Sequence, residues 1–100
     1  MSDLCCSILC PPDVEERLLD ALLMEHPDDV FFSTPTFAHG VAHGSMRADE
    51  QVEGRARAML VQILLPAGGW RPLRRRLRED FAGTGLRYWT TPLHDSGACA

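Results

Sequence analysis

Two His-Gly pairs stand four residues apart in a stretch of small residues, at His39-Gly40 and His43-Gly44. Imidazole is a common ligand of zinc, copper and nickel, and neutral histidine binds such an ion at pH 7 without a large cost of deprotonation. Two histidines do not complete a tetrahedral site, so a further ligand must come from elsewhere in the chain or from another subunit. We therefore expect a divalent transition metal at His39 and His43. The alternative is an exposed loop whose histidines are incidental.

Arginines gather in two places. Arg55 and Arg57 share one face of an expected strand, where they could meet a phosphate or a carboxylate, or pair with Glu50 and Glu53 across an interface. Five more stand at positions 71, 74, 75, 76 and 78. The formal net charge of −4 argues against nucleic acid as the main partner, because phosphates need a basic face. We expect the second group to be a solvated helix face.

A glycine-rich turn is a further candidate site. Gly83-Thr84-Gly85 offers backbone amides, and Arg87 follows two residues later. Such amides can cradle an anion, although two glycines are also ordinary where a helix turns into a strand. Both interpretations stay open from the residues alone.

The four cysteines point to packing rather than to chemistry. Three of them, Cys5, Cys6 and Cys10, crowd into six residues, and the fourth is Cys99. Neighbouring positions on one strand are poorly placed to form a disulfide, and their spacing is not that of a Cys-x-x-Cys metal loop. We expect Cys5, Cys6 and Cys10 to be free cysteines that are buried as small hydrophobic side chains.

The elements that must position these groups follow from hydrophobic periodicity and from Pro and Gly. Pro35 lies inside one expected strand, which favours a place at the sheet edge. The predicted order is strand 4–10, helix 13–26, strand 30–37, loop 38–50, strand 52–65, helix 70–81 and strand 86–91.

This βαββαβ order predicts an α+β, ferredoxin-like fold: a four-stranded antiparallel sheet with two helices on one face. The chain of 100 residues, 45% of them apolar, suits a single domain over residues 1–100. Its loop near 38–50 is expected to be flexible and its tail at 93–100 frayed. The nearly continuous apolar run at residues 59–65 implies that the second face is also covered, most simply by a partner subunit.

The sequence lacks the patterns of a membrane span, a signal peptide and a catalytic motif. No apolar run approaches the roughly 20 residues that span a bilayer, and no basic residue precedes the first apolar run as in a signal peptide. No catalytic signature is present. We expect a cytoplasmic protein without enzymatic activity.

The chain resembles a family of small proteobacterial PII-like proteins of unknown function, often found beside heavy-metal efflux systems. The matching elements are Cys10-Pro11-Pro12 before an acidic amphipathic helix, the two His-Gly pairs, Glu50-Gln51-Val52-x-Gly54-Arg55-x-Arg57, Trp70, and Tyr88-Trp89 followed by Pro92.

The resemblance implies a homotrimer whose sheets face inward, an arrangement shared with the CutA family. It also implies that residues 38–50 form a signalling loop that docks on a partner such as a membrane transporter or an efflux system. PII nucleotide sites lie between subunits, at the position that Gly83, Gly85 and Arg87 occupy here, and the nucleotide hypothesis adds Arg55 to that cleft. The longer phosphate-binding turn of PII proteins is not reproduced.

We therefore expect a regulatory or sensor protein linked to transition-metal homeostasis. A nucleotide-sensing regulator of a transporter is one alternative. A structural interaction module without a small ligand is the other.

Overall fold

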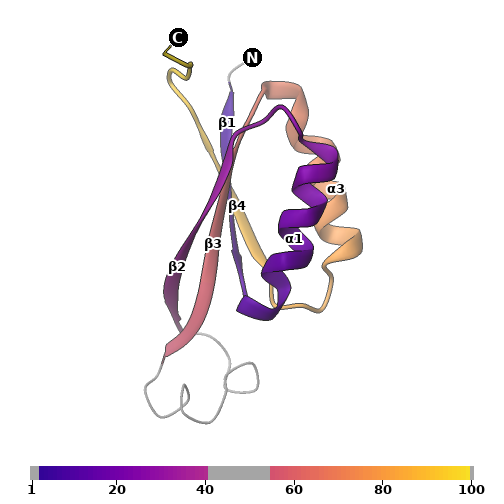
Figure 1. Ribbon diagram of the computed structural model, residues 1–100, viewed down its shortest axis with the longest axis vertical. Helices are drawn as coiled ribbons and strands as arrows, with labels where there is room; N and C mark the ends of the chain where they lie inside the picture. Colours follow the sequence, from indigo (N-terminus) through magenta and orange to yellow (C-terminus); the bar gives the residue numbers. More distant parts are fainter. Residues whose placement is uncertain (1–2, 41–54, 100) are drawn as a thin grey trace.

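The computed structural model describes residues 3–40 and 55–99 (Figure 1). Strands and helices follow the predicted order, with a short 3-10 turn added before the second helix. No helix within these residues is long and apolar enough to span a bilayer. The elements are β1 (Leu4–Cys10), α1 (Pro12–Glu25), β2 (Phe31–His39), β3 (Arg55–Leu65), η2 (Ala67–Gly69), α3 (Trp70–Asp80) and β4 (Arg87–Pro92).

The four strands form one antiparallel sheet in the order β2-β3-β1-β4. β1 lies in the middle and pairs with β3 on one side and β4 on the other. α1 and α3 lie side by side on one face of the sheet (Figure 1). The predicted ferredoxin-like α+β fold is confirmed, and β2, which contains Pro35, is an edge strand as expected.

The hydrophobic core lies between this sheet and the helices. Ile8 stands opposite Val61 and Cys6 opposite Ile63, so these four side chains share one face, and each is 0% exposed. Each helix contributes apolar residues that stand four positions apart, which are Val14, Leu18 and Leu22 from α1 and Leu73 and Leu77 from α3. Full burial of each large apolar side chain stabilises the fold by roughly 1.5–3 kcal/mol.

Prolines set both ends of α1. The helix begins at Pro12, where a missing backbone N–H costs nothing. It ends just before His26, as predicted, because Pro27 disfavours helical geometry in the residue before it. The His26 N–H donates to the Leu22 carbonyl at 2.8 Å, and its Nδ1 lies 3.0 Å from the Asp29 carboxylate. These two contacts of His26 close the C-terminal end of α1.

β2 extends further than the sequence predicted. Ala38 and His39, which were assigned to the loop, continue the strand because Ala56 and Arg55 of β3 stand opposite them. The remainder of the predicted loop, from residue 41 onward, lies outside the described residues.

Candidate functional site

β2 and β3 continue beyond the rest of the sheet as a two-stranded ribbon (Figure 1). The pairing of β1 with β3 ends at Met59, whereas β2 stays paired with β3 as far as His39 and Arg55. We name residues 36–39 and 55–58 the β2–β3 arm. At about 3.3 Å of rise per residue, the arm reaches about 13 Å past the end of β1.

His39 and Arg55 stand opposite each other at the tip of the arm. His39 is exposed and Arg55 is half-buried. The Arg55 guanidinium lies 4.2 Å from the centre of the Phe37 ring, in a cation–π contact. Arg57 stands opposite Phe37, so the two arginines share a face as predicted. The arm therefore presents cationic and aromatic groups beside one imidazole.

The described donor atoms do not complete a metal site at His39. His43, its predicted companion, lies outside the described residues. Across residues 3–40 and 55–99, no three His, Cys, Asp or Glu side chains are grouped to hold an ion. Arg55 opposite His39 adds a positive charge that disfavours a bound cation. A metal at His39 would need His43 and at least one further ligand from outside this set.

The turn between α3 and β4 is held by hydrogen bonds of Thr84. Gly83 and Gly85 have φ of 77° and 83°, the left-handed region that favours glycine. The Thr84 hydroxyl donates to the Phe81 carbonyl at 2.6 Å and accepts from the N–H two residues later at 3.4 Å. A Cβ on Gly85 would lie 3.7 Å from Pro11, so the turn packs beside the start of α1. The left-handed φ values account for the glycine at both positions.

Arg55 and Arg87 lie far apart within one chain. Arg87 stands opposite Leu9 of β1, and Leu9 stands opposite Leu60 of β3. Arg55 is a further five residues along β3, a separation of about 16 Å at the usual rise of a strand. A nucleotide cleft that uses both arginines must take them from different copies of the chain.

Cys6 and Cys10 are buried and unreactive. They are 0% and 1% exposed. Burial, with the neighbouring Cys5 thiol as a smaller cause, raises the pKa of Cys6 to about 12. Burial, followed by the charges of Glu15 and Asp13, raises the pKa of Cys10 to about 11. Thiols that stay protonated are poor nucleophiles and poor metal ligands, which confirms the predicted packing role of these two residues.

Comparison with known proteins places the whole chain in one family. The sequence pattern of the family described as "Protein of unknown function (DUF3240)" matches residues 1–100. The chain belongs to the DUF3240 family. A search of the curated proteins finds no match.

Two solved structures share the fold of this DUF3240 protein. The crystal structure of a DUF3240 family protein from Shewanella baltica superposes with a TM-score of 0.80 at 15% identity, covering 100% of this chain and 99% of that chain. The crystal structure of a "putative PII-like signaling protein" from Thermus thermophilus superposes with a TM-score of 0.62 at 14% identity, covering 93% of this chain and 91% of that chain. At these identities the likeness shows the fold, and it confirms the predicted PII-like architecture.

The open face of the DUF3240 sheet, away from the helices, carries an exposed aromatic residue on each edge strand and one polar pair at its centre. Phe32 and Trp89, from the two edge strands, are each 47% exposed. At the centre the Gln62 amide donates to the Ser7 hydroxyl at 3.2 Å, and Ser7 is only 3% exposed. This pair was not predicted, although Ser7 and Gln62 are the polar interruptions of their two apolar runs.

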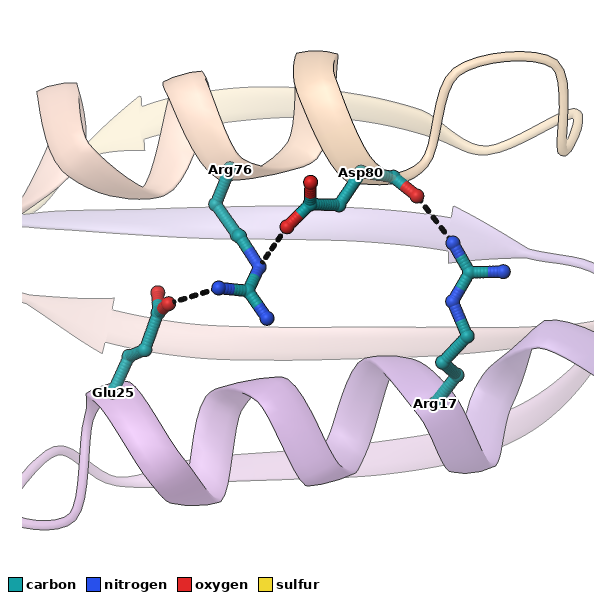
Figure 2. Close-up of polar contacts among 4 residues, drawn as sticks. All are labelled: Arg17, Glu25, Arg76 and Asp80. Carbon is teal, nitrogen blue, oxygen red and sulfur yellow. Dashed lines mark hydrogen bonds and ion pairs between the residues drawn. The ribbon is translucent and has the colours of Figure 1, made fainter.

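Arg17 and Arg76 connect the outer sides of α1 and α3 (Figure 2). Arg76 Nη1 lies 2.5 Å from the Glu25 carboxylate, and its Nε contacts the Asp80 carboxylate. The Arg17 guanidinium donates to the Asp80 carbonyl and lies 4.6 Å from the centre of the Phe81 ring. These groups surround an open groove of about 630 Å³. Arg76, predicted on a solvated face, is instead tied to α1.

Proposed function

We propose that this DUF3240 protein is a cytoplasmic, non-enzymatic regulator of PII-like type that signals through the β2–β3 arm and the loop predicted at 38–50. The observation that carries the proposal is the arm itself. It extends a two-stranded, paired ribbon beyond the sheet and ends in exposed His39 beside the Arg55–Phe37 contact. A loop held on such a scaffold is well placed to dock on a partner, which we propose to be a membrane transporter or efflux system.

The regulator works as a homotrimer with the open sheet faces turned inward. The exposed Phe32 and Trp89 side chains support this assembly, because a second copy would remove their apolar surface from water. The hydrogen bond between Gln62 and Ser7 also supports it. Two polar groups that already pair can be covered without losing a partner.

Native mass spectrometry in high salt tests the assembly. Wild type should give three times the 11.1 kDa mass of one chain. Phe32→Arg/Trp89→Arg should give single chains, because the added charges oppose burial. Met24→Arg is the matched control, since Met24 is an 83% exposed apolar residue on the helix side, and it should stay trimeric. Single chains in wild type would overturn the trimer.

The ligand that regulates signalling through the arm is a divalent transition metal, which is held by His39 with His43 and a third ligand from elsewhere. Exposed His39 at the arm tip supports this, and Arg55 opposite it counts against it. Zinc, copper or nickel should raise the Tm of wild type, because a ligand selective for the native state stabilises it. The His39→Ala/His43→Ala variant should lose the rise and His94→Ala should keep it. Equal shifts in wild type and the double variant would exclude this site.

A nucleotide between subunits is the second candidate. It is supported by the open space around Gly83 and by the exposure of Arg87. In the same assay, ATP, ADP or a cyclic nucleotide should raise the Tm of wild type but not of Arg55→Ala/Arg87→Ala. If neither metal nor nucleotide changes the Tm, a structural interaction module is the function that remains.

A further inference from the structure

β4 is the edge strand on the opposite side of the sheet from β2. The Leu93 N–H donates to the Asp3 carbonyl at 3.0 Å, which continues the register between β4 and β1. Antiparallel partners exchange backbone hydrogen bonds at every second residue, so Thr91 also turns its backbone groups toward β1. Tyr88 and Thr90 therefore turn theirs away from the sheet, and no strand of the described residues pairs with them there.

Three arginines of α3 lie above this edge. Arg78 Nε donates to the Tyr88 hydroxyl oxygen at 2.8 Å, and Arg74 bonds to the same side chain. Arg71 shares their side of the helix, because it stands three residues before Arg74 and seven before Arg78. We name Arg71, Arg74 and Arg78 the arginine row. All three are exposed, and within the described part of the chain none forms an ion pair with an acidic side chain.

α3 keeps its acidic side chains on the side that faces α1. Glu79 and Asp80 line the groove between the helices, and Asp80 contacts Arg76 there (Figure 2). No acidic residue occurs from position 81 to position 94, a stretch that includes all of β4. The flank formed by the arginine row and the β4 edge is thus cationic in a chain whose net charge is −4. Such a flank attracts a negatively charged partner.

Tyr88 holds two of the three arginines in place. The hydrogen bonds from Arg78 and then Arg74 lower the pKa of Tyr88. The Tyr88 ring in turn packs edge-on against Trp70, with ring centroids 5.4 Å apart. Side chains that are already ordered lose less entropy when a ligand binds. The arginine row is therefore partly preorganised for an anionic partner.

We propose that the β4 edge binds an extended acidic segment of another protein, which adds to the four-stranded sheet as a further strand. The outward backbone groups of Tyr88 and Thr90 supply the hydrogen bonds of this strand addition. Residues that stand opposite each other in an antiparallel ladder project to the same face. Tyr88 and Thr90 project to the helix face, since they stand opposite the buried Ile8 and Cys6. The two partner residues opposite them then project toward the arginine row, and both are Asp or Glu.

The length of the arginine row fits two carboxylates at alternate positions of a strand. β3 and β4 both run antiparallel to β1, so α3, which connects them, runs back along β4. Arg71 therefore lies further toward the Pro92 end of β4 than Arg78 does. The two arginines are about 10.5 Å apart along the helix axis, whereas alternate residues of a strand are about 6.6 Å apart. Both carboxylates fall within the length of the row.

The described edge strands of a second copy cannot supply these carboxylates. β2 and β4 contain no Asp or Glu, and Pro35 of β2 has no N–H to donate. This is the reason to assign the segment to a different protein. The inference goes beyond the proposed function, because the site lies at the other edge of the sheet from β2 and uses no residue of the arm.

Amide hydrogen exchange followed by NMR, with and without a synthetic peptide, tests the proposal. The probe is acetyl-Thr-Thr-Glu-Val-Glu-Thr-Thr-amide, whose glutamates occupy alternate positions. In the free protein the N–H groups of Tyr88 and Thr90 should exchange as exposed amides do, and saturating probe should slow both about tenfold or more. The isomer acetyl-Thr-Thr-Val-Glu-Glu-Thr-Thr-amide has the same charge but turns its glutamates to opposite faces, so it should bind about fivefold more weakly.

A charge reversal in the row should weaken binding of the probe. Arg71→Glu leaves the bonds of Tyr88 in place and should lower the affinity about fivefold in an NMR titration. Arg57→Glu makes the same change in net charge at an exposed arginine near the opposite end of the sheet. It should bind the probe like wild type in about 0.15 M salt, where charges more than about 8 Å apart are largely screened. Unchanged melting temperatures establish that both variants fold.

Each of four results would overturn the proposal. The first is slow exchange of the Tyr88 and Thr90 N–H groups in the free protein, which would show that another copy already covers the edge. The second is the absence of probe binding. The third is binding that leaves both exchange rates unchanged, as ion pairing to the helix alone would do. The fourth is equal affinity of wild type and Arg71→Glu for the probe, or of wild type for the two peptides.

Discussion

The two faces of the sheet are built from the same strands, yet they bury their residues very differently. Along β1, Cys6, Ile8 and Cys10 point to the helices and are at most 1% exposed. Their alternating neighbours point to the open face, where Cys5 and Leu9 stay half-buried and, of the three, the small Ser7, which stands between Gln62 and Trp89, is covered. Apolar composition alone therefore does not decide burial, because a side chain also needs a layer packed opposite it. The helices supply that layer on one side only.

Truncating a helix-side residue should give the largest effect. Leu18 of α1 is 0% exposed, so Leu18→Ala should lower the free energy of unfolding by about 4 kcal/mol through lost transfer energy and a cavity. Leu9→Ala on the open face should lower it by about 1 kcal/mol, since less apolar surface returns to water. Urea denaturation in the Trp89→Arg background keeps assembly from covering Leu9. Equal decreases in the free energy of unfolding for Leu18→Ala and Leu9→Ala would contradict the difference in burial between the two faces.

Alkaline pH should destabilise the helix side by a smaller amount. Burial raises the pKa of Cys10 from its ordinary 9.0 to about 11, so the unfolded thiol loses its proton first. Stability from this group is fully present below pH 9 and is lost as the pH rises from 9 to about 11. The loss should reach up to about 3 kcal/mol. Urea unfolding at these two pH values should show that the free energy of unfolding decreases less in Cys10→Ala than in wild type. An equal decrease in both would show that Cys10 is not the cause.

Breaking the polar centre of the open face should give the smallest change. Ser7→Ala removes the hydroxyl that accepts from the Gln62 amide and should lower the free energy of unfolding by about 1 kcal/mol. Thr34→Ala is the control, at an exposed hydroxyl on the same face. If the two variants unfold at the same urea concentration, the Ser7–Gln62 bond adds nothing to stability.

The fold could be predicted because its determinants are local. Pro11 and Pro27 bracket α1, Gly83 and Gly85 turn the chain after α3, and the apolar period changes between strands and helices. The face shared by Arg55 and Arg57 follows from strand alternation in the same way. The end of β2 was less predictable. Ala38 and His39 have weak strand propensity, and only the pairing with β3 keeps them extended.

The side-chain contacts between distant elements could not be predicted. Arg17 and Asp80 are 63 residues apart, and nothing in either helix indicates which arginine faces its neighbour. Gln62 and Ser7, 55 residues apart, meet only because the register of β1 with β3 sets them opposite each other. The predicted partners of His39 and Arg57 in the loop lie outside the described residues, so the metal site remains a prediction.

The central position of β1 has a consequence for biosynthesis. Of the four strands, β1 is synthesised before its neighbours, so it forms no ladder until residues 55–65 have followed it, and its second edge waits for residues 87–92. The complete sheet must therefore wait until residue 92 has been synthesised, and pairing over such separations is intrinsically slow. During that interval Cys6 and Cys10 are ordinary accessible thiols, vulnerable to oxidants that the finished fold excludes.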